Sequence, residues 1–129
     1  MPHLTIEYTK NLRPAPSFDE LFGRLHTVLA DLAGIKPGNC KSRAVELDQF
    51  YVGEGDARSA FVHADIRFLE GRSVAVKQDI GRAILAVLQE AFPTPAEAQD
   101  MQVTVEIRDI QRSLYFKHPE GSLTYGDSP

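Results

Sequence analysis

Apolar and polar residues alternate along several stretches of the chain, with the period of two that is typical of half-buried β-strands. In the first stretch, residues 2–8, the apolar Leu4, Ile6 and Tyr8 are separated by polar residues. Proline is tolerated at the first residue of a strand, so Pro2 is compatible with this prediction. Similar patterns predict three further strands, over residues 41–52, 59–69 and 101–110.

Two longer segments repeat apolar residues every three to four positions, which is the spacing of an amphipathic helix. Ser17 precedes the first segment and Glu20 follows three positions later, so we expect a capping box between them. Gly34 is expected to end this helix. Ser73 is the expected N-cap of the second helix, and Pro93 lies beyond its end.

The predicted order is strand, helix, strand in each of two halves, which makes two β-α-β units. Right-handed crossovers place both helices on one face of a four-stranded sheet, so the predicted fold class is α+β. The turn-forming residues 53–56 are interpreted as a hairpin turn, and residues 113–129 as a short strand followed by a loose tail. A length of 129 residues predicts one domain over residues 1–129.

Helices on one face of a sheet leave its other face to be covered. Apolar residues occur on both sides of the predicted strands. We therefore expect the bare face to pack against copies of the chain in a small oligomer.

Composition narrows the classes of partner. Hydrophobic residues at 43% and charged residues at 25% are ordinary for a soluble globular protein. A net charge of -4 argues against nucleic acid, and no apolar run is long enough to span a membrane. The single cysteine, Cys40, and the absence of a signal segment favour a cytoplasmic protein. One cysteine and scattered histidines also give no metal-ligand spacing.

Five short motifs follow one another in the order "MPHLTIEYT", "KSR", "AFVH", "GRS" and "SLYFKH". In order and approximate spacing they resemble the 5-carboxymethyl-2-hydroxymuconate isomerases of the tautomerase superfamily, over nearly the whole chain. The resemblance implies a tautomerase-like fold assembled as a homotrimer. It also implies a cofactor-free keto–enol tautomerisation of a small anionic dienol or keto acid, a step in bacterial aromatic catabolism.

The resemblance also implies which residues act. The catalytic residue is Pro2, whose secondary amine becomes free when the initiator methionine is excised, and Arg72 assists it. Lys41, Arg43 and Arg72 are the expected substrate-binding residues. Lys41 stands where such isomerases carry an arginine, and lysine keeps the charge but loses the planar fork that matches a carboxylate.

The predicted chemistry needs a base whose pKa is near the working pH. Apolar neighbours and nearby cations would both disfavour the ammonium form of Pro2 and so lower its pKa. Arg72 immediately precedes the expected N-cap Ser73, so the free N–H groups of the second helix would face the same anion.

Several alternatives stay open from the sequence. Arg72 could be a solvated loop residue, Lys41 a solvated residue at a strand edge, and Arg43 could pair with Glu46 or Asp48. The activity could be that of another superfamily member, such as a phenylpyruvate-type tautomerase, a dehalogenase or a decarboxylase. If Met1 stays attached, the Pro2 nitrogen is an amide and no base, and the protein could be a non-catalytic trimeric binding module.

Overall fold

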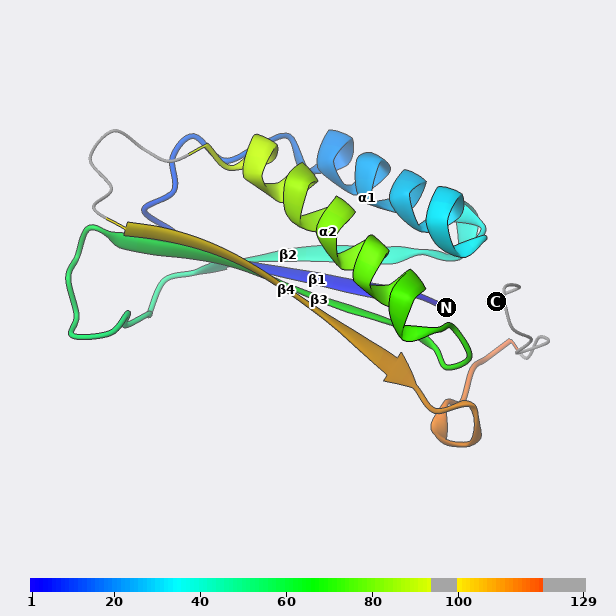
Figure 1. Cartoon of the computed structure of the whole chain (residues 1–129). Helices are drawn as coiled ribbons and strands as arrows, with labels where there is room; N and C mark the ends of the chain where they lie inside the picture. Colours follow the sequence, from blue (N-terminus) through cyan, green and yellow to red (C-terminus); the bar gives the residue numbers. More distant parts are fainter. Residues whose placement is uncertain (94–99, 120–129) are drawn as a thin grey trace.

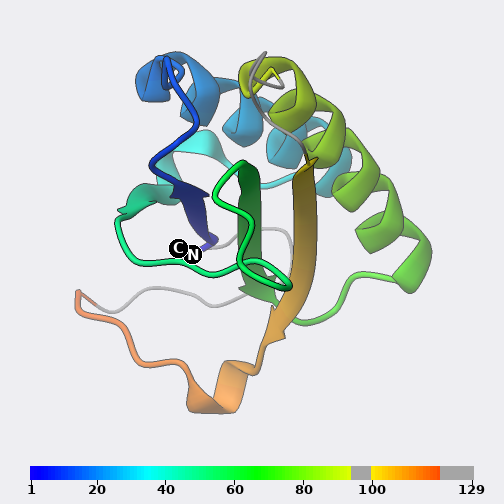
Figure 2. The same ribbon diagram turned by 90° about the vertical axis from the view of Figure 1, so that its left-hand side faces the viewer.

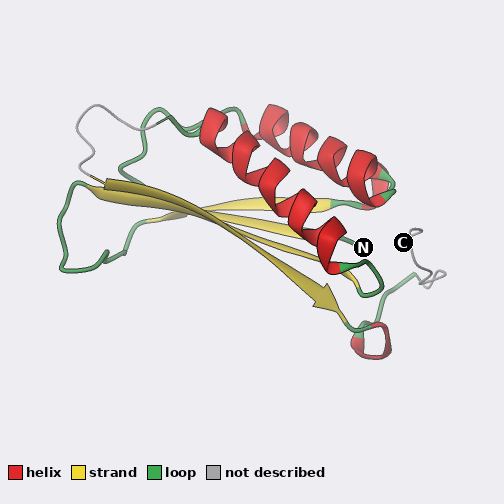
Figure 3. Cartoon of the chain, in the orientation of Figure 1, coloured by secondary structure: helices red, strands yellow, loops and turns green. Residues whose placement is uncertain are grey.

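The computed structural model describes residues 1–93 and 100–119. Its main elements are β1 (His3–Thr9), α1 (Phe18–Ala33), β2 (Lys41–Leu47), β3 (Ser59–Leu69), α2 (Val74–Ala91) and β4 (Asp100–Ile110). Short 3₁₀ helices cover Pro37–Asn39 and Arg112–Leu114. Both helices lie on one face of a four-stranded sheet (Figures 1 and 3), which confirms the predicted α+β class and the two β-α-β halves. Neither described helix has the length and hydrophobicity needed to cross a membrane.

The strand order across the sheet is β2-β1-β3-β4. Each half contributes one parallel pair, β1 with β2 and β3 with β4, and the halves meet where β1 runs antiparallel to β3. In this register His3 lies beside Lys41 on one side and Arg67 on the other. The start of β1 therefore lies beside the start of β2 and the end of β3.

Strict alternation along the strands builds the core between the sheet and the helices. The side chains of Leu4, Ile6, Val62, Ala64 and Ile66 are fully buried on the helix side of the sheet. Complementary leucines and isoleucines of both helices pack against them; these are Leu21, Leu25, Leu29, Ile80, Ile84 and Leu88. Burial of about ten such side chains is the main source of stability of this layer, because each contributes roughly 1.5–3 kcal/mol.

The helix caps are those predicted from the sequence, except for one capping hydrogen bond. Gly34 adopts a left-handed conformation with φ 66° and ends α1 as expected. The Ser73 hydroxyl accepts a hydrogen bond from the N–H of Val76, which confirms it as the N-cap of α2. Ser17 is the N-cap of α1, but its side chain makes no capping hydrogen bond, so the predicted capping box with Glu20 is wrong.

Three predicted details of the connections are also wrong. β2 ends at Leu47 rather than at residue 52, because its partner β1 ends at Thr9. The glycine turn at residues 53–56 is present, but β1 lies between β2 and β3, so the turn does not close a hairpin. After β4 the chain forms a 3₁₀ helix where a short strand was expected. The expected loose tail lies in part at residues 120–129, outside the described residues.

The open face of the sheet is polar, not apolar as predicted. Its side chains alternate with the core residues and include His3, Thr5, Glu7, Arg43, His63, Asp65, Arg67, Thr104, Glu106 and Arg108. The segment that follows β4 lies on this side, opposite the helices (Figure 2). The open face is therefore not the apolar surface from which an oligomer was predicted.

Candidate active site

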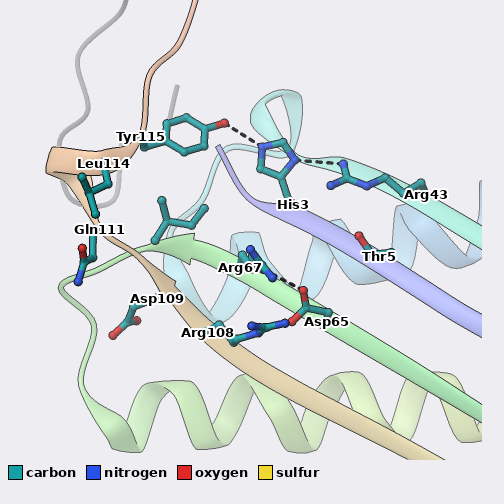
Figure 4. Close-up of a pocket in the computed structure, with 11 residues that line it drawn as sticks. His3, Thr5, Arg43, Asp65, Arg67, Arg108, Asp109, Gln111, Leu114 and Tyr115 are labelled. Carbon is teal, nitrogen blue, oxygen red and sulfur yellow. Dashed lines mark hydrogen bonds and ion pairs between the residues drawn. The ribbon is translucent and has the colours of Figure 1, made fainter.

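A cavity of about 640 Å³ lies on the open face, at the end of the sheet where β1 begins. Its walls come from all four strands and from the segment after β4 (Figure 4). The lining residues are His3, Thr5, Arg43, Asp65, Arg67, Arg108, Asp109, Ile110, Gln111, Leu114 and Tyr115. Three of them are arginines and two are aspartates, so the cavity carries local positive charge in a chain whose net charge is -4.

Three side chains on one wall form a continuous hydrogen-bonded chain. His3 Nε2 lies 2.8 Å from the hydroxyl of Tyr115, and a guanidinium nitrogen of Arg43 lies 3.1 Å from His3 Nδ1. The residues come from β1, β2 and the segment after β4, and they lie in one line in Figure 4. This chain fixes both the guanidinium of Arg43 and the phenol of Tyr115 at the cavity wall.

A second cluster lies beside the first, on β3 and β4. The carboxylate of Asp65 accepts hydrogen bonds from Arg67 Nε at 2.9 Å and from Arg108 Nε at 2.8 Å. Burial raises the pKa of Asp65, but the hydrogen bonds from Arg108 and Arg67 outweigh it, so the pKa is lowered overall. Asp65 is therefore ionised at neutral pH and holds both arginines over the cavity.

The N-terminus lies next to these groups. Met1 and Pro2 are buried, and the Met1 amine donates a hydrogen bond to the carbonyl oxygen of Asn39 at 2.8 Å. The pKa of this amine is lowered from 8.0 to about 5, mainly by burial and then by the nearby charge of Lys41. Lys117 acts in the same direction, whereas Cys40 raises the pKa. The Met1 amine is therefore neutral at physiological pH.

The family described as 5-carboxymethyl-2-hydroxymuconate isomerase matches residues 2–121 of this sequence. The chain belongs to this isomerase family. A curated relative, the 5-carboxymethyl-2-hydroxymuconate Delta-isomerase of Escherichia coli, is 27% identical over 118 residues, which are 91% of this chain and 93% of the relative.

Solved structures agree with the family. A 5-carboxymethyl-2-hydroxymuconate isomerase from Deinococcus radiodurans R1 is 32% identical and superposes with a TM-score of 0.77, over 90% of this chain and 87% of that one. A fused 4-OT symmetric trimer shares the fold, with a TM-score of 0.67 at 18% identity, over 86% of this chain and 87% of that one. The fold is therefore that of the tautomerases, as the sequence predicted.

Two of the cations expected of this isomerase family lie beside the N-terminus or the cavity. Lys41 is exposed, and its Nζ is 3.4 Å from the carbonyl oxygen of Asn39, the same oxygen that binds the Met1 amine. Arg43 lines the cavity and contacts His3. Its alternative ion pairs are not formed, because Glu46 pairs with Arg13 and Asp48 pairs with Lys10.

Arg72 lies elsewhere and does not line the cavity. Its side chain is 5% exposed, and its guanidinium donates hydrogen bonds to the carbonyl oxygens of Ala33 and Leu69. The guanidinium carbon also lies 5.1 Å from the centre of the Phe68 ring. The interpretation of Arg72 as a solvated loop residue is therefore wrong, and its role in catalysis and substrate binding stays a prediction.

Of the residues that line the cavity, only Arg43 was predicted from the sequence; those not predicted include His3, Arg67, Arg108 and Tyr115. Three of them occupy alternate positions on the polar side of strands, so the period of two already indicated that they share a face. Tyr115 follows the last strand, and no local pattern connects it with His3. Within residues 1–93 and 100–119, no group of three or more histidine, cysteine, aspartate or glutamate side chains could hold a metal ion.

The single thiol is a poor candidate for a nucleophile. Burial raises the pKa of Cys40, although the N-terminal amine and Lys41 act against this rise. A thiol with a raised pKa carries little thiolate at neutral pH. Cys40 is half-buried in the structure.

Proposed function

We propose that the chain, after removal of Met1, catalyses the ketonisation of a 2-hydroxymuconate-type dienol with the Pro2 amine as general base and acid. The observation that carries this proposal is the environment of the N-terminal amine, which lowers its pKa to about 5. Family membership supports the reaction class. Dienols of this type are intermediates of aromatic catabolism, and we propose that pathway class for this isomerase.

We propose that a Pro2 amine, one residue further along, would share the surroundings that lower the pKa of the Met1 amine. Consecutive Cα atoms are about 3.8 Å apart, so the Pro2 nitrogen lies within the same buried end of β1. Removal of Met1, which is fully buried, would leave room for a ligand beside that nitrogen. A proline amine is a secondary amine held by its ring in the strand direction, so it would be a rigid base.

The proposed reaction moves one proton. The neutral Pro2 nitrogen takes the proton from the enol hydroxyl, which leaves a delocalised dienolate. The protonated nitrogen then returns a proton to a carbon of the conjugated chain, so a C–H bond and a carbonyl group form and the amine is neutral again. Lys41 and Lys117, whose charges already act on this end of the chain, would stabilise the negative charge of the dienolate.

We propose that a substrate carboxylate is bound in the cavity beside His3. Arg43 lines this cavity and uses one of its five N–H groups on His3, so it keeps donors for a carboxylate. Lys41 lies beside Arg43 on the same face of β2, two positions earlier. With Pro2 and His3 adjacent in β1, one end of a conjugated acid could lie at the amine and its carboxylate in the cavity.

We further propose that the isomerase assembles as a homotrimer through the edge of its sheet. β4 forms one edge and pairs only with β3 among the described strands. A mostly apolar cavity of about 580 Å³ lies between this edge strand and α2, with Leu85, Val103 and Val105 among its lining residues. A second chain can add a strand to an unpaired sheet edge and cover an apolar groove beside it. The related 4-OT structure is described as a trimer.

The experiment that tests the proposed reaction is a spectrophotometric assay of dienol decay with 2-hydroxymuconate. Pro2→Ala replaces the secondary amine by a primary amine, which loses the fixed ring geometry and changes the basicity. We expect at least a tenfold lower rate, which corresponds to about 1.4 kcal/mol of transition-state stabilisation. Pro16→Ala, in the connection before α1, is the matched control and should leave the rate unchanged.

Two results would contradict the proposal. Equal rates for Pro2→Ala and the unaltered protein would exclude Pro2 as the base. Binding of the dienol without any isomerisation by protein that begins at Pro2 would instead favour the non-catalytic binding module.

A further inference from the structure

The geometry points to Tyr115 as a hydrogen-bond donor to a carboxylate bound in the cavity, with His3 as the positioning residue that orients it. The identity of the bound anion as a dienol rests on the proposed function, but the hydrogen-bond argument does not.

The direction of each hydrogen bond in the wall follows from the groups that make it. A guanidinium only donates, so His3 Nδ1 must accept the hydrogen bond from Arg43 at 3.1 Å. In a neutral imidazole the proton then sits on Nε2, which donates to the hydroxyl oxygen of Tyr115 at 2.8 Å. The phenol oxygen is therefore an acceptor in this contact, and its own proton is left to donate elsewhere.

Among the described residues the Tyr115 hydroxyl makes this one hydrogen bond. Its side chain is half-buried and lines the cavity, so a ligand there is the available acceptor. Burial raises the pKa of the phenol, which keeps the proton in place at neutral pH.

Burial and the surrounding cations favour the neutral state of the His3 imidazole. Burial lowers its pKa from 6.5, and the charges of Arg43 and Lys41 on β2 lower it further. The N-terminal amine and Arg67 on β3 act in the same direction. Tyr115 is the remaining polar neighbour and is uncharged. No carboxylate is among the groups that shift this pKa, so nothing near the ring favours the imidazolium.

The ligand chemistry that fits this wall is a carboxylate. Arg43 and Tyr115 contact the two nitrogens of one imidazole ring from either side (Figure 4), and both line the cavity. Asp65 on β3 is engaged by Arg67 and Arg108 and does not compete for these donors. A planar anion would accept from the guanidinium and from the phenol together.

The test measures binding of trans,trans-muconate, a conjugated dicarboxylate without the enol hydroxyl, by isothermal titration calorimetry. Tyr115→Phe removes the donor alone, and we expect about tenfold weaker binding with a comparable rise in KM for the dienol. Tyr51→Phe is the matched control, because this exposed tyrosine only donates to the backbone of Glu54. Thermal unfolding should give the same midpoint for Tyr115→Phe and the unaltered protein.

His3 is tested by the pH dependence of the same binding. At a pH below the lowered pKa of His3, the imidazolium would have N–H groups on both sides and would repel Arg43, so muconate binding should weaken. In His3→Gln the amide oxygen can accept from Arg43 and the amide nitrogen can donate to Tyr115, so binding at pH 7.5 should be kept while this pH dependence disappears. His63→Gln, on the same face but bonded to Thr104, should leave the pH dependence intact.

The outcomes separate this inference from the proposed function. Equal muconate affinity for Tyr115→Phe and the unaltered protein would overturn it, as would the absence of any muconate binding at millimolar concentration. If the processed protein does not isomerise the dienol, the proposed function fails. Tenfold weaker muconate binding in Tyr115→Phe would still support the inference in that case.

Discussion

Replacing Arg72 by alanine should lower the free energy of unfolding by about 3 kcal/mol. The guanidinium joins the last residue of α1 to the end of β3 through the carbonyl oxygens of Ala33, at 2.9 and 3.3 Å, and Leu69, at 3.3 Å. A hydrogen bond from a charged group contributes a net ~1.5 kcal/mol or more, and two carbonyl groups would lose such a donor. Loss of the stacking on Phe68 adds to this cost.

The assay is thermal unfolding by circular dichroism, at a fixed protein concentration because an oligomer unfolds at a concentration-dependent temperature. A loss of about 3 kcal/mol corresponds to a midpoint roughly 10 °C lower for a chain of this size. Arg13→Ala is the matched control: this arginine makes one exposed ion pair with Glu46, so it should cost less than about 1 kcal/mol. An unchanged midpoint for Arg72→Ala would refute the structural role, and lost turnover with an unchanged midpoint would assign Arg72 to the substrate.

Three further outcomes are expected. Lys41→Gln removes a cation that lowers the pKa of the N-terminal amine, so the acid limb of the pH–rate profile should move to higher pH; an unmoved limb would contradict this. Leu85→Asp should shift sedimentation from trimer to monomer, whereas Gln89→Asp, exposed on α2, should not. Burial lowers the pKa of His3 and of His26, so the unfolded chain binds protons first and the free energy of unfolding should fall below about pH 6.5. Urea unfolding at pH 7.5 and 5.5 measures this, and equal stability would count against it.

The sequence predicts the ends of a helix or strand well where neighbouring residues in the chain determine them. The alternation over residues 59–69 matches β3 at both ends, and the conformation of Gly34 ends α1 because a left-handed residue was needed there. The end of β2 is not local, since it depends on where β1 stops offering hydrogen bonds. The polar open face follows from the same alternation, which places His63, Asp65 and Arg67 opposite the core residues of β3, so the prediction of an apolar second face was wrong.

The candidate site likewise combines residues that the sequence identified with contacts that only the fold shows. Lys41 and Arg43 were identified by resemblance, and their positions two apart on a strand place both on one face. The contact of His3 with Tyr115 joins residues 112 positions apart, so only the folded chain reveals it. Arg72 was expected at the start of α2 and is found there, but the direction of its guanidinium depends on the carbonyl groups at the end of α1.

The most direct test of the central claim compares two forms of the same sequence, one with Met1 retained and one beginning at Pro2, each verified by intact mass. With Met1 attached the Pro2 nitrogen is an amide with no basic lone pair. We expect the processed form to ketonise 2-hydroxymuconate with a rate that rises as pH increases through the pKa of its amine. The form that keeps Met1 should be nearly inactive under the same conditions. Equal rates for the two forms would contradict the assignment of Pro2 as the catalytic base.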